Sequence, residues 1–314
     1  MSSGPGRLVT LIQTDPHHPG TLLAGTAAAQ LFRSRDGGVS WIPLSFPAAL
    51  HAGLHALVID NSKPDTYFVA LSSELPQYAG VFRTVDEGAT WEHLPGLDQK
   101  QVFALTCWAS DGRVLGAGTQ EGVFLSQDGG DTWKHLSSSN SSWPRPVVSI
   151  TLDAKSRNTI YAGTPHLAWK TTDGGKRWFR MSRGMRDDSD IFVINVDGVR
   201  PKRLLAGACS GIYRSVDGGF TWKSLEDAVG GQHRTYLLAR PPGRPNIVFA
   251  ATSDGLMQSS DGGGTWQIVS PQSTRSIAFD PVDSNLVFAA TDKGVLRSQD
   301  GGMHFTVLST DSGL

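Results

Sequence analysis

The stretch SQDGGDTW, from Ser126 to Trp133, decides the fold, because near-copies of it recur along the chain. It joins a hydroxyl residue, an acid, two glycines and a large aromatic residue, a composition typical of a tight turn. The copies begin at Ser34, Thr84, Ser126, Thr171, Ser215, Ser259 and Ser298. Their acids are 39 to 50 residues apart, which matches the length of a propeller blade of four short strands.

The residues between the turns repeat as well. In the last repeat, TRSIAFDPVDSNLVFAATDKGVLRSQDGGMHFTVL (274–308), four β-rich runs are divided by Gly, Pro, Asp and Asn. Such runs predict short strands, which we call A to D, with the quoted turn between C and D. We therefore predict an all-β fold: a single seven-bladed β-propeller of four-stranded antiparallel blades, closed by packing of the first repeat on the last. One domain covers 1–314, with blades at approximately 7–46, 53–95, 101–137, 146–182, 190–226, 234–270 and 274–309.

Each residue type in the repeated turn has a structural use. The glycines permit positive φ, the acid can accept N–H groups of its own turn, and the aromatic residue is expected to begin strand D and wedge between blades. One substrate meets only one or two acids, so seven equivalent acids around a ring point to braces rather than catalysts. The predicted structural acids are Asp36, Asp86, Asp128, Asp173, Asp217, Asp261 and Asp300. The predicted structural aromatic residues are Trp41, Trp91, Trp133, Trp178, Trp222, Trp266 and Phe305.

Composition excludes several kinds of partner. The net charge of −1 and a pI near 6.8 argue against nucleic-acid binding, because phosphates need excess positive charge. No apolar run approaches the roughly 20 residues of a membrane span, so no membrane insertion is expected. Cys107 and Cys209 lie in different repeats and are expected to be buried free thiols. We expect a monomer with no cofactor and no metal site. The first residues, MSSGPGRLV, contain no signal-peptide core, so the compartment is cytoplasmic as the chain stands, and secreted or periplasmic if a leader was removed.

Basic residues recur at one position of strand C, each after an apolar residue. They are Arg33, Arg83, Lys170, Arg214 and Arg297, while Leu125 and Gln258 interrupt the series. A ring of cations suggests anion binding. The simpler interpretation is that each stem packs along its blade and each head reaches solvent or a neighbouring acid.

The repeated turn resembles the Asp-box, or bacterial neuraminidase repeat, with the pattern S/T-x-D-x-G-x-T-W. The surrounding frame is similar to photosystem II assembly-factor-like proteins, sortilin-type receptor propellers and xyloglucan-cleaving glycosidases. Departures occur at Glu87, Arg177, His304 and Phe305. The resemblance implies the fold much more than a function, because this fold carries hydrolases, receptors and assembly factors.

Within that resemblance, two enzyme activities are disfavoured. Sialidases carry an Arg-Ile-Pro-like motif, which the chain lacks, and a tyrosine nucleophile, whereas Tyr67, Tyr161 and Tyr213 are expected inside strands B or C. The xyloglucan-type enzymes use two facing propellers with an acid from each. A single propeller supplies one wall of such a cleft.

The expected binding surface is the face formed by the D–A and B–C loops, because those loops vary while the Asp-box turns are nearly uniform. Its candidate residues are Trp143, Arg145, Arg183, Arg186, Asp188, Glu226, His233, Arg234, Tyr236 and Arg275. An exposed tryptophan beside an arginine suits a sugar ring or a partner side chain. The alternative is a solvated charged rim with Trp143 folded back on its blade.

These residues support two functions. The first is a non-enzymatic binding or assembly module that takes a protein or carbohydrate ligand on this face. The second is a glycoside hydrolase or lyase acting on a polysaccharide, with Asp188 and Glu226 as its acids. Such a pair needs two carboxylates about 5 to 9.5 Å apart, but flanking arginines favour ion pairs instead. A third interpretation is that the propeller is one part of a larger protein.

Overall fold

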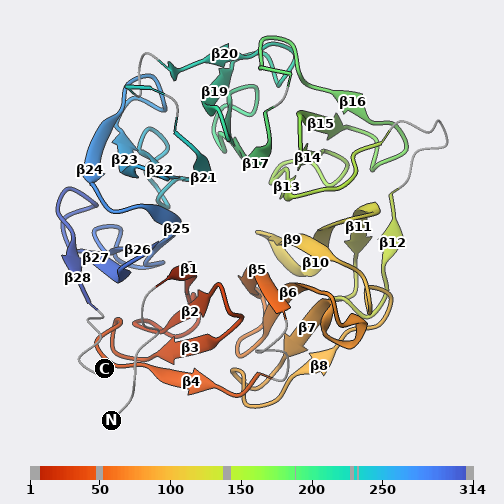
Figure 1. Cartoon of the computed structure of the whole chain (residues 1–314), viewed down its shortest axis with the longest axis vertical. Coiled ribbons are helices and arrows are strands. Elements are labelled where there is room, and N and C mark those ends of the chain that lie inside the picture. Colours follow the sequence, from red (N-terminus) through yellow and green to blue (C-terminus); the bar gives the residue numbers. More distant parts are fainter. Residues whose placement is uncertain are drawn as a thin grey trace.

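The computed structural model describes residues 8–46, 52–136, 143–187, 189–226, 230–231 and 233–308. Their strands form seven separate four-stranded antiparallel sheets, arranged as blades around a central axis (Figure 1). The prediction of a seven-bladed all-β propeller is confirmed. In every blade strand A lies innermost and strand D outermost.

Within each blade, the strands follow one another in chain order from the central axis to the rim. The first two blades contain β1 (Val9–Thr14), β2 (Leu22–Thr26), β3 (Leu31–Ser34), β4 (Ile42–Leu44), β5 (Ala52–Ile59), β6 (Tyr67–Ser73), β7 (Gly80–Thr84) and β8 (Glu92–His93). The next two contain β9 (Val102–Trp108), β10 (Asp111–Thr119), β11 (Gly122–Ser126), β12 (Lys134–His135), β13 (Ser149–Leu152), β14 (Ile160–Thr164), β15 (Leu167–Thr171) and β16 (Phe179–Arg180). The last three contain β17 (Ile191–Val196), β18 (Leu204–Ala208), β19 (Gly211–Ser215), β20 (Lys223–Ser224), β21 (Thr235–Ala239), β22 (Val248–Thr252), β23 (Gly255–Ser259), β24 (Gln267–Ser270), β25 (Thr274–Phe279), β26 (Val287–Thr291), β27 (Gly294–Ser298) and β28 (Thr306–Val307). A 3₁₀ turn, η1 (Pro76–Tyr78), lies in the B–C loop of the second blade.

The second strand of each blade explains the uninterrupted apolar runs in the sequence. Every residue of β2 (LLAGT) and of β26 (VFAAT) is buried. These strands lie inside their sheets, and neighbouring blades cover both of their faces, so they lack the alternation of a half-exposed strand. The outermost strands are short and mostly exposed, as in β28.

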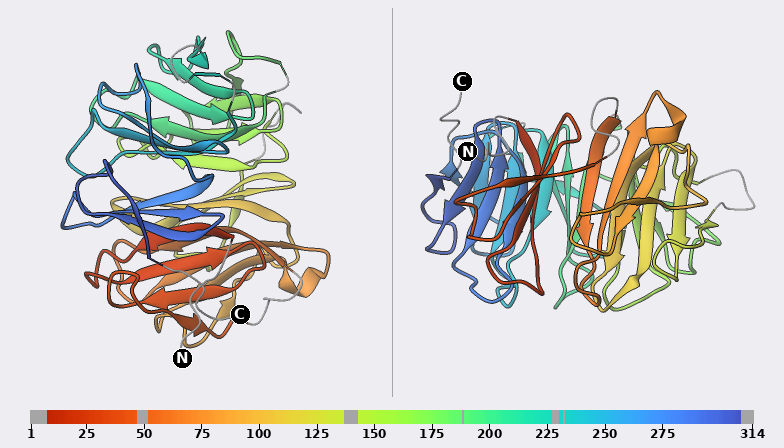
Figure 2. Two further views of the ribbon diagram at one scale, coloured as in Figure 1. Left: turned by 60° about the vertical axis from the view of Figure 1, so that its left-hand side comes forward. Right: turned by 90° about the horizontal axis from the view of Figure 1, so that it is seen from below.

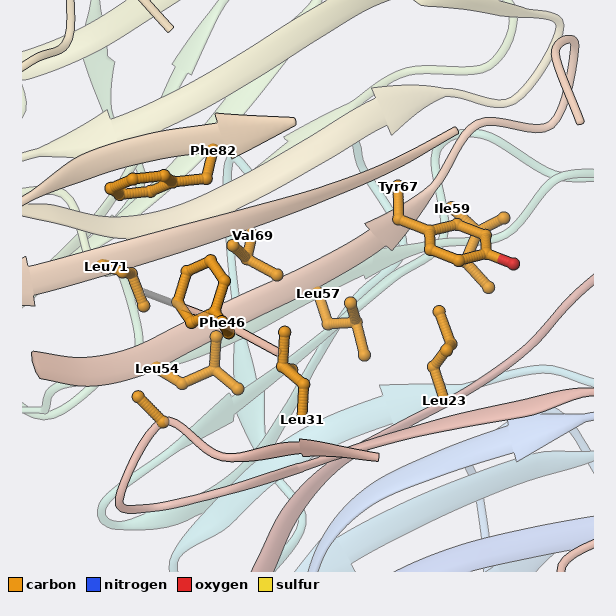
Figure 3. Close-up of a cluster of buried hydrophobic side chains, with 11 residues drawn as sticks. Leu23, Leu31, Phe46, Leu54, Leu57, Ile59, Tyr67, Val69, Leu71 and Phe82 are labelled. Atoms are coloured by element: carbon orange, nitrogen blue, oxygen red, sulfur yellow. The ribbon is translucent and has the colours of Figure 1, made fainter. Parts of the chain in front are cut away.

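The hydrophobic core is divided into seven clusters, one between each pair of neighbouring blades. Figure 3 shows the cluster in which Leu23 and Leu31 of the first blade face Leu57 and Val69 of the second. Each cluster also includes the Asp-box aromatic residue of the later blade. That aromatic ring therefore packs against the blade before its own.

The last interface closes the ring without an exchanged strand, because each sheet in the described chain consists of four consecutive strands. Val9 and Trp41 of the first blade share a buried cluster with Phe288 of the last. Ser276 Oγ accepts a hydrogen bond from the Ile12 N–H at 3.3 Å. Thr14 Oγ1 donates to the Phe279 carbonyl at 2.6 Å.

The turns divide the propeller into two distinct faces (Figure 2, right). In the first blade the Gly37 N–H donates to the Gly20 carbonyl at 2.9 Å, which joins the C–D turn to the A–B turn. An equivalent bond occurs in every blade; in the third, the Gly129 N–H donates to the Arg113 carbonyl at 2.8 Å. We call this side the Asp-box face, and the opposite side the loop face, which carries the D–A and B–C loops.

Two smaller features concern membrane spans and the cysteines. Within the described residues, no helix has the length and hydropathy needed to cross a bilayer. Neither cysteine forms a disulfide with another described residue, as expected, but both are half-buried rather than fully buried. Cys107 lies on the inner strand β9, where burial raises the pKa of its thiol to about 11.

Replacing one Asp-box tryptophan should test how much its packing between two blades stabilises the fold. Trp222 is 5% exposed and packs in the cluster that contains Tyr161 and Met181 of the preceding blade. We expect Trp222→Ala to lower the free energy of unfolding by about 3–5 kcal/mol, through lost burial and a cavity. Urea denaturation followed by circular dichroism measures this change. Val39→Ala is the control, because Val39 lies in the same motif of another blade but is 66% exposed; equal midpoints for the two variants would contradict the wedge.

Candidate functional site

The Asp-box carboxylates accept hydrogen bonds inside their own turns. In the third blade, Asp128 Oδ1 accepts hydrogen bonds from Ser126 Oγ at 2.8 Å and from the Thr132 N–H at 2.9 Å. Its Oδ2 accepts from Thr132 Oγ1 at 2.5 Å. The Ser126 hydroxyl also accepts the Gly130 N–H at 2.8 Å. The acid thus ties both ends of the turn together.

The other blades repeat this network, including those with unusual residues. Arg177 supplies only its N–H to Asp173, at 2.9 Å, while His304 supplies its N–H and Nδ1 to Asp300, at 3.0 and 2.7 Å. Glu87 holds a positive φ of 56° where the other turns have glycine, and its carboxylate forms ion pairs with Arg33 and Arg35.

Several of the basic side chains that recur on strand C contact the backbone of the next blade, which sequence analysis did not predict. Arg83 Nη1 donates to the Gly129 carbonyl at 3.1 Å, and Lys170 Nζ to the Gly218 carbonyl at 3.0 Å. Both acceptors are the residue after the Asp-box acid of the next blade. Gln258, which interrupts the series in sequence, keeps the contact: its Nε2 donates to the Gly301 carbonyl at 3.1 Å. These side chains link neighbouring blades, and Arg83 also pairs with acids.

Trp143 and Arg145 lie on the loop face beside the third and fourth blades. Trp143 is half-buried and packs on the hydrophobic cluster between these blades. Its Nε1 donates to the Glu121 carbonyl at 3.3 Å, and the Arg145 guanidinium lies 4.8 Å from the ring centre. The tryptophan is therefore folded onto the blade, with the exposed Arg145 above it.

Of the two candidate acids, Glu226 lies within the described residues. Glu226 Oε2 accepts a hydrogen bond from Arg186 Nη2 at 2.9 Å, which is the ion pair that the flanking arginines suggested. Asp188 lies outside the described residues. The Arg183 carbonyl accepts the Trp222 N–H at 2.8 Å, and His233 Nδ1 lies 2.7 Å from Asp254 Oδ2. These contacts tie the loops of neighbouring blades, or of one blade, to each other.

Arg234, Tyr236 and Arg275 come together with an aromatic residue that sequence analysis missed. The Arg275 guanidinium lies 3.9 Å from the centre of the Tyr236 ring, and that ring lies 5.9 Å from Phe192. Arg234 lies 6.0 Å from the Phe192 ring. We call these four residues the mouth cluster, because they stand at or just before the start of inner strands, next to the loop face.

The mouth cluster borders a central cavity of about 400 Å³ lined by residues of all seven inner strands. His55 and Phe103 border it on the opposite side, with their rings 5.4 Å apart. Tyr236 was expected just beyond one D–A loop and Arg275 at the end of another, and both are the second residue of an inner strand. Phe103 and Phe192 occupy the same position, so an aromatic residue at the second position of strand A is the signal that could have revealed this site.

One group of potential metal ligands occurs on the Asp-box face. His18, Asp65 and Glu87 offer ligand atoms within 4.8 Å of one another. His18 Nδ1 lies 3.1 Å from Asp15, three residues earlier, and the fold brings Nε2 to 3.5 Å from Asp65 of the second blade. Arg33 and Arg35 already pair with Glu87 and would repel a cation. The group is an ion-pair cluster between the first two blades.

Comparison with known proteins identifies the family. The model of the photosynthesis system II assembly factor YCF48 family matches residues 85–243, which is just over half of the chain. The chain belongs to the YCF48 assembly factor family. A search of curated proteins gave no match.

Solved structures agree with the fold. YCF48 bound to D1 peptide has 19% identity and a TM-score of 0.66, covering 94% of this chain and 95% of that one. YCF48 from Cyanidioschyzon merolae has 18% identity and a TM-score of 0.67, covering 94% and 96%. The GH74 xyloglucanase from Xanthomonas campestris has 20% identity and a TM-score of 0.74, covering 96% of this chain but 53% of its own. This YCF48 family chain thus spans about half the length of that enzyme, and these identities establish the fold alone.

The Asp-box carboxylates should make stability fall in acid. Hydrogen bonds from the turn, above all from threonine hydroxyls, lower the pKa of Asp86, Asp128 and Asp217 to about 2. The ordinary value is 3.8, so their stabilisation is complete above about pH 4 and is lost as the pH falls towards about 2. Urea midpoints measured across this range should drop, and the drop should be shallower in Asp128→Asn. Unchanged midpoints down to about pH 2 would rule out this account of the turns.

Proposed function

We propose that this YCF48 family chain is a non-enzymatic assembly module that binds a segment of a partner protein on its loop face, at the mouth cluster. Membership of the YCF48 assembly factor family supports an assembly role. The single observation that best supports this site is the stacking of the Arg275 guanidinium on the Tyr236 ring, 3.9 Å from the ring centre. The pair lies beside Phe192 and borders the central cavity.

The chemistry of the mouth cluster suits a protein segment. Tyrosine and arginine are enriched among residues that dominate binding energy in protein interfaces. Tyr236 and Phe192 are half-buried and held by their strands, while Arg234 and Arg275 are exposed. The aromatic rings offer apolar surface at low entropic cost, and the two guanidinium groups can pair with backbone carbonyls or carboxylates of the ligand.

The partner class also has support from a similar propeller, since a YCF48 has been solved with D1 peptide bound. We propose that the ligand of this chain is likewise a peptide segment rather than a carbohydrate. On the same face, the Glu226 carboxylate forms an ion pair with Arg186. A glycosidase function would need a second wall, because the similar xyloglucanase is nearly twice as long.

Binding of a fluorescent D1 peptide, measured by anisotropy, tests the proposal. We expect Tyr236→Ala to weaken binding about 30-fold, the effect of losing about 2 kcal/mol at a central anchor. Arg275→Ala should weaken it through lost pairing and lost stacking. Val282→Ala is the control, because Val282 is 78% exposed in an A–B turn of the opposite face. Failure of the unmodified chain to bind, or equal affinity in Tyr236→Ala, would refute the proposal.

A second assay separates binding from hydrolysis. The chain should release no reducing ends from a panel of plant, bacterial and algal polysaccharides. Release that disappears in an Asp188→Asn/Glu226→Gln variant would establish a hydrolase with those acids. Release that persists in the variant would place an enzymatic site elsewhere, and either result would contradict a purely non-enzymatic module.

A further inference from the structure

The groove between the fifth and sixth blades departs from the inter-blade pattern. The strand C side chains of Arg33, Arg83, Lys170 and Gln258 each donate to a backbone carbonyl in the next Asp-box turn. Leu125 cannot donate at this position, and Arg297 lies near Gly37 of the equivalent turn without donating a hydrogen bond to a described residue. Arg214 occupies the same position in the fifth blade. Its guanidinium makes neither a hydrogen bond nor an ion pair with the residues that the structure describes.

Equivalent arginines obtain their counter-charges from three positions. Arg33 pairs with Glu87, the residue after the acid of the next turn. Arg83 pairs with Asp131, two residues further along such a turn, and with Glu92, its partner across the sheet. At the corresponding positions around Arg214 stand Gly262, Gly264 and Lys223. Two counter-ions are thus absent, and the third is replaced by a like charge, which is unfavourable directly across a strand pair.

Further cations surround the same groove. Arg203, Arg214 and Arg240 line a cavity of about 280 Å³, together with residues of the next Asp-box turn. Arg240 follows strand A, where five other blades have an aspartate that accepts N–H groups of the A–B turn; those acids are Asp15, Asp60, Asp153, Asp197 and Asp280. Arg240 is held by Asn195 at 2.9 Å and by the Pro245 carbonyl at 2.7 Å.

The acid that borders this cavity is already committed to its turn. Asp261 accepts hydrogen bonds from Ser259 Oγ, the Gly264 N–H and Thr265. Burial lowers the pKa of Arg240, and the charges of Arg200 and Arg203 lower it further, while Asp197 opposes them. The cavity is lined by three arginines and one aspartate, so positive charge prevails among its lining residues.

We infer that the groove between the fifth and sixth blades binds a phosphate-class oxyanion, with Arg203, Arg214 and Arg240 as its cationic lining. A tetrahedral phosphate offers oxygens in several directions and can accept hydrogen bonds from guanidinium groups on different elements, whereas a carboxylate offers two oxygens in one plane. The bound oxyanion would stand where Glu87 stands between Arg33 and Arg35 in the first groove. The site lies by the Asp-box turns, away from the proposed peptide site.

Calorimetric titration of the full chain with inorganic phosphate, at constant ionic strength held with chloride, tests this inference. We expect saturable binding to the unmodified chain and at least tenfold weaker binding to Arg214→Gln. Glutamine should fold at this position, because Gln258 occupies the equivalent position of the sixth blade. Arg83→Gln is the matched control and should bind phosphate unchanged, since Asp131 and Glu92 already neutralise that groove.

Two further arms define the ligand class. A phosphate monoester such as glycerol phosphate should compete with inorganic phosphate, and acetate at the same ionic strength should not. Absence of saturable phosphate binding would overturn the inference, as would equal affinities in Arg214→Gln and the unmodified chain. Acetate binding as tight as phosphate binding would overturn the assignment to phosphate.

Discussion

The hydrogen bonds between each Asp-box carboxylate and its own turn are the interaction on which the propeller depends. They fix the C–D turn, and the turn in turn fixes two groups that contact the preceding blade. One is the aromatic ring that enters the inter-blade cluster, as Trp178 does. The other is the carbonyl after the acid, which accepts the strand C side chain, as Gly218 accepts Lys170. A local turn thereby sets a long-range interface, and seven repetitions close a ring with no long free sheet edge.

The fold was predictable because its determinants are local and repeated. Turn residues mark the strand ends, and the spacing of the acids gives the blade length, so the seven sheets follow from sequence alone. The inter-blade link at strand C was not predictable. Its acceptor is a backbone carbonyl some 45 residues away, as from Arg83 to Gly129, and a carbonyl leaves no trace in the sequence. Gln258 shows the consequence. It lacks the positive charge found at the equivalent position of other blades, but it still donates a hydrogen bond to the next Asp-box turn.

The candidate site was only partly predictable, for a reason that belongs to propellers. The innermost strands face a central cavity, so apolar residues there look like core residues. Sequence analysis did not single out Phe192 and named Tyr236 and Arg275 only as candidates for the loop face, although all three lie at the second position of strand A. The loop residues behaved as local chemistry suggests: Arg186 pairs with Glu226, and Arg145 covers Trp143.

In a repeat protein, each residue can be compared with the residues at the equivalent position of the other blades. A residue that differs from its equivalents is therefore informative. Where Glu87 replaces glycine, the same groove gains two arginine partners, so the change is compensated within the chain. Where Lys223 stands opposite Arg214, no described residue compensates the added charge. Selection for stability alone favours the first arrangement, since like charges across a strand pair cost free energy. A like-charge pair without a described counter-ion is therefore where chemistry beyond folding should be sought.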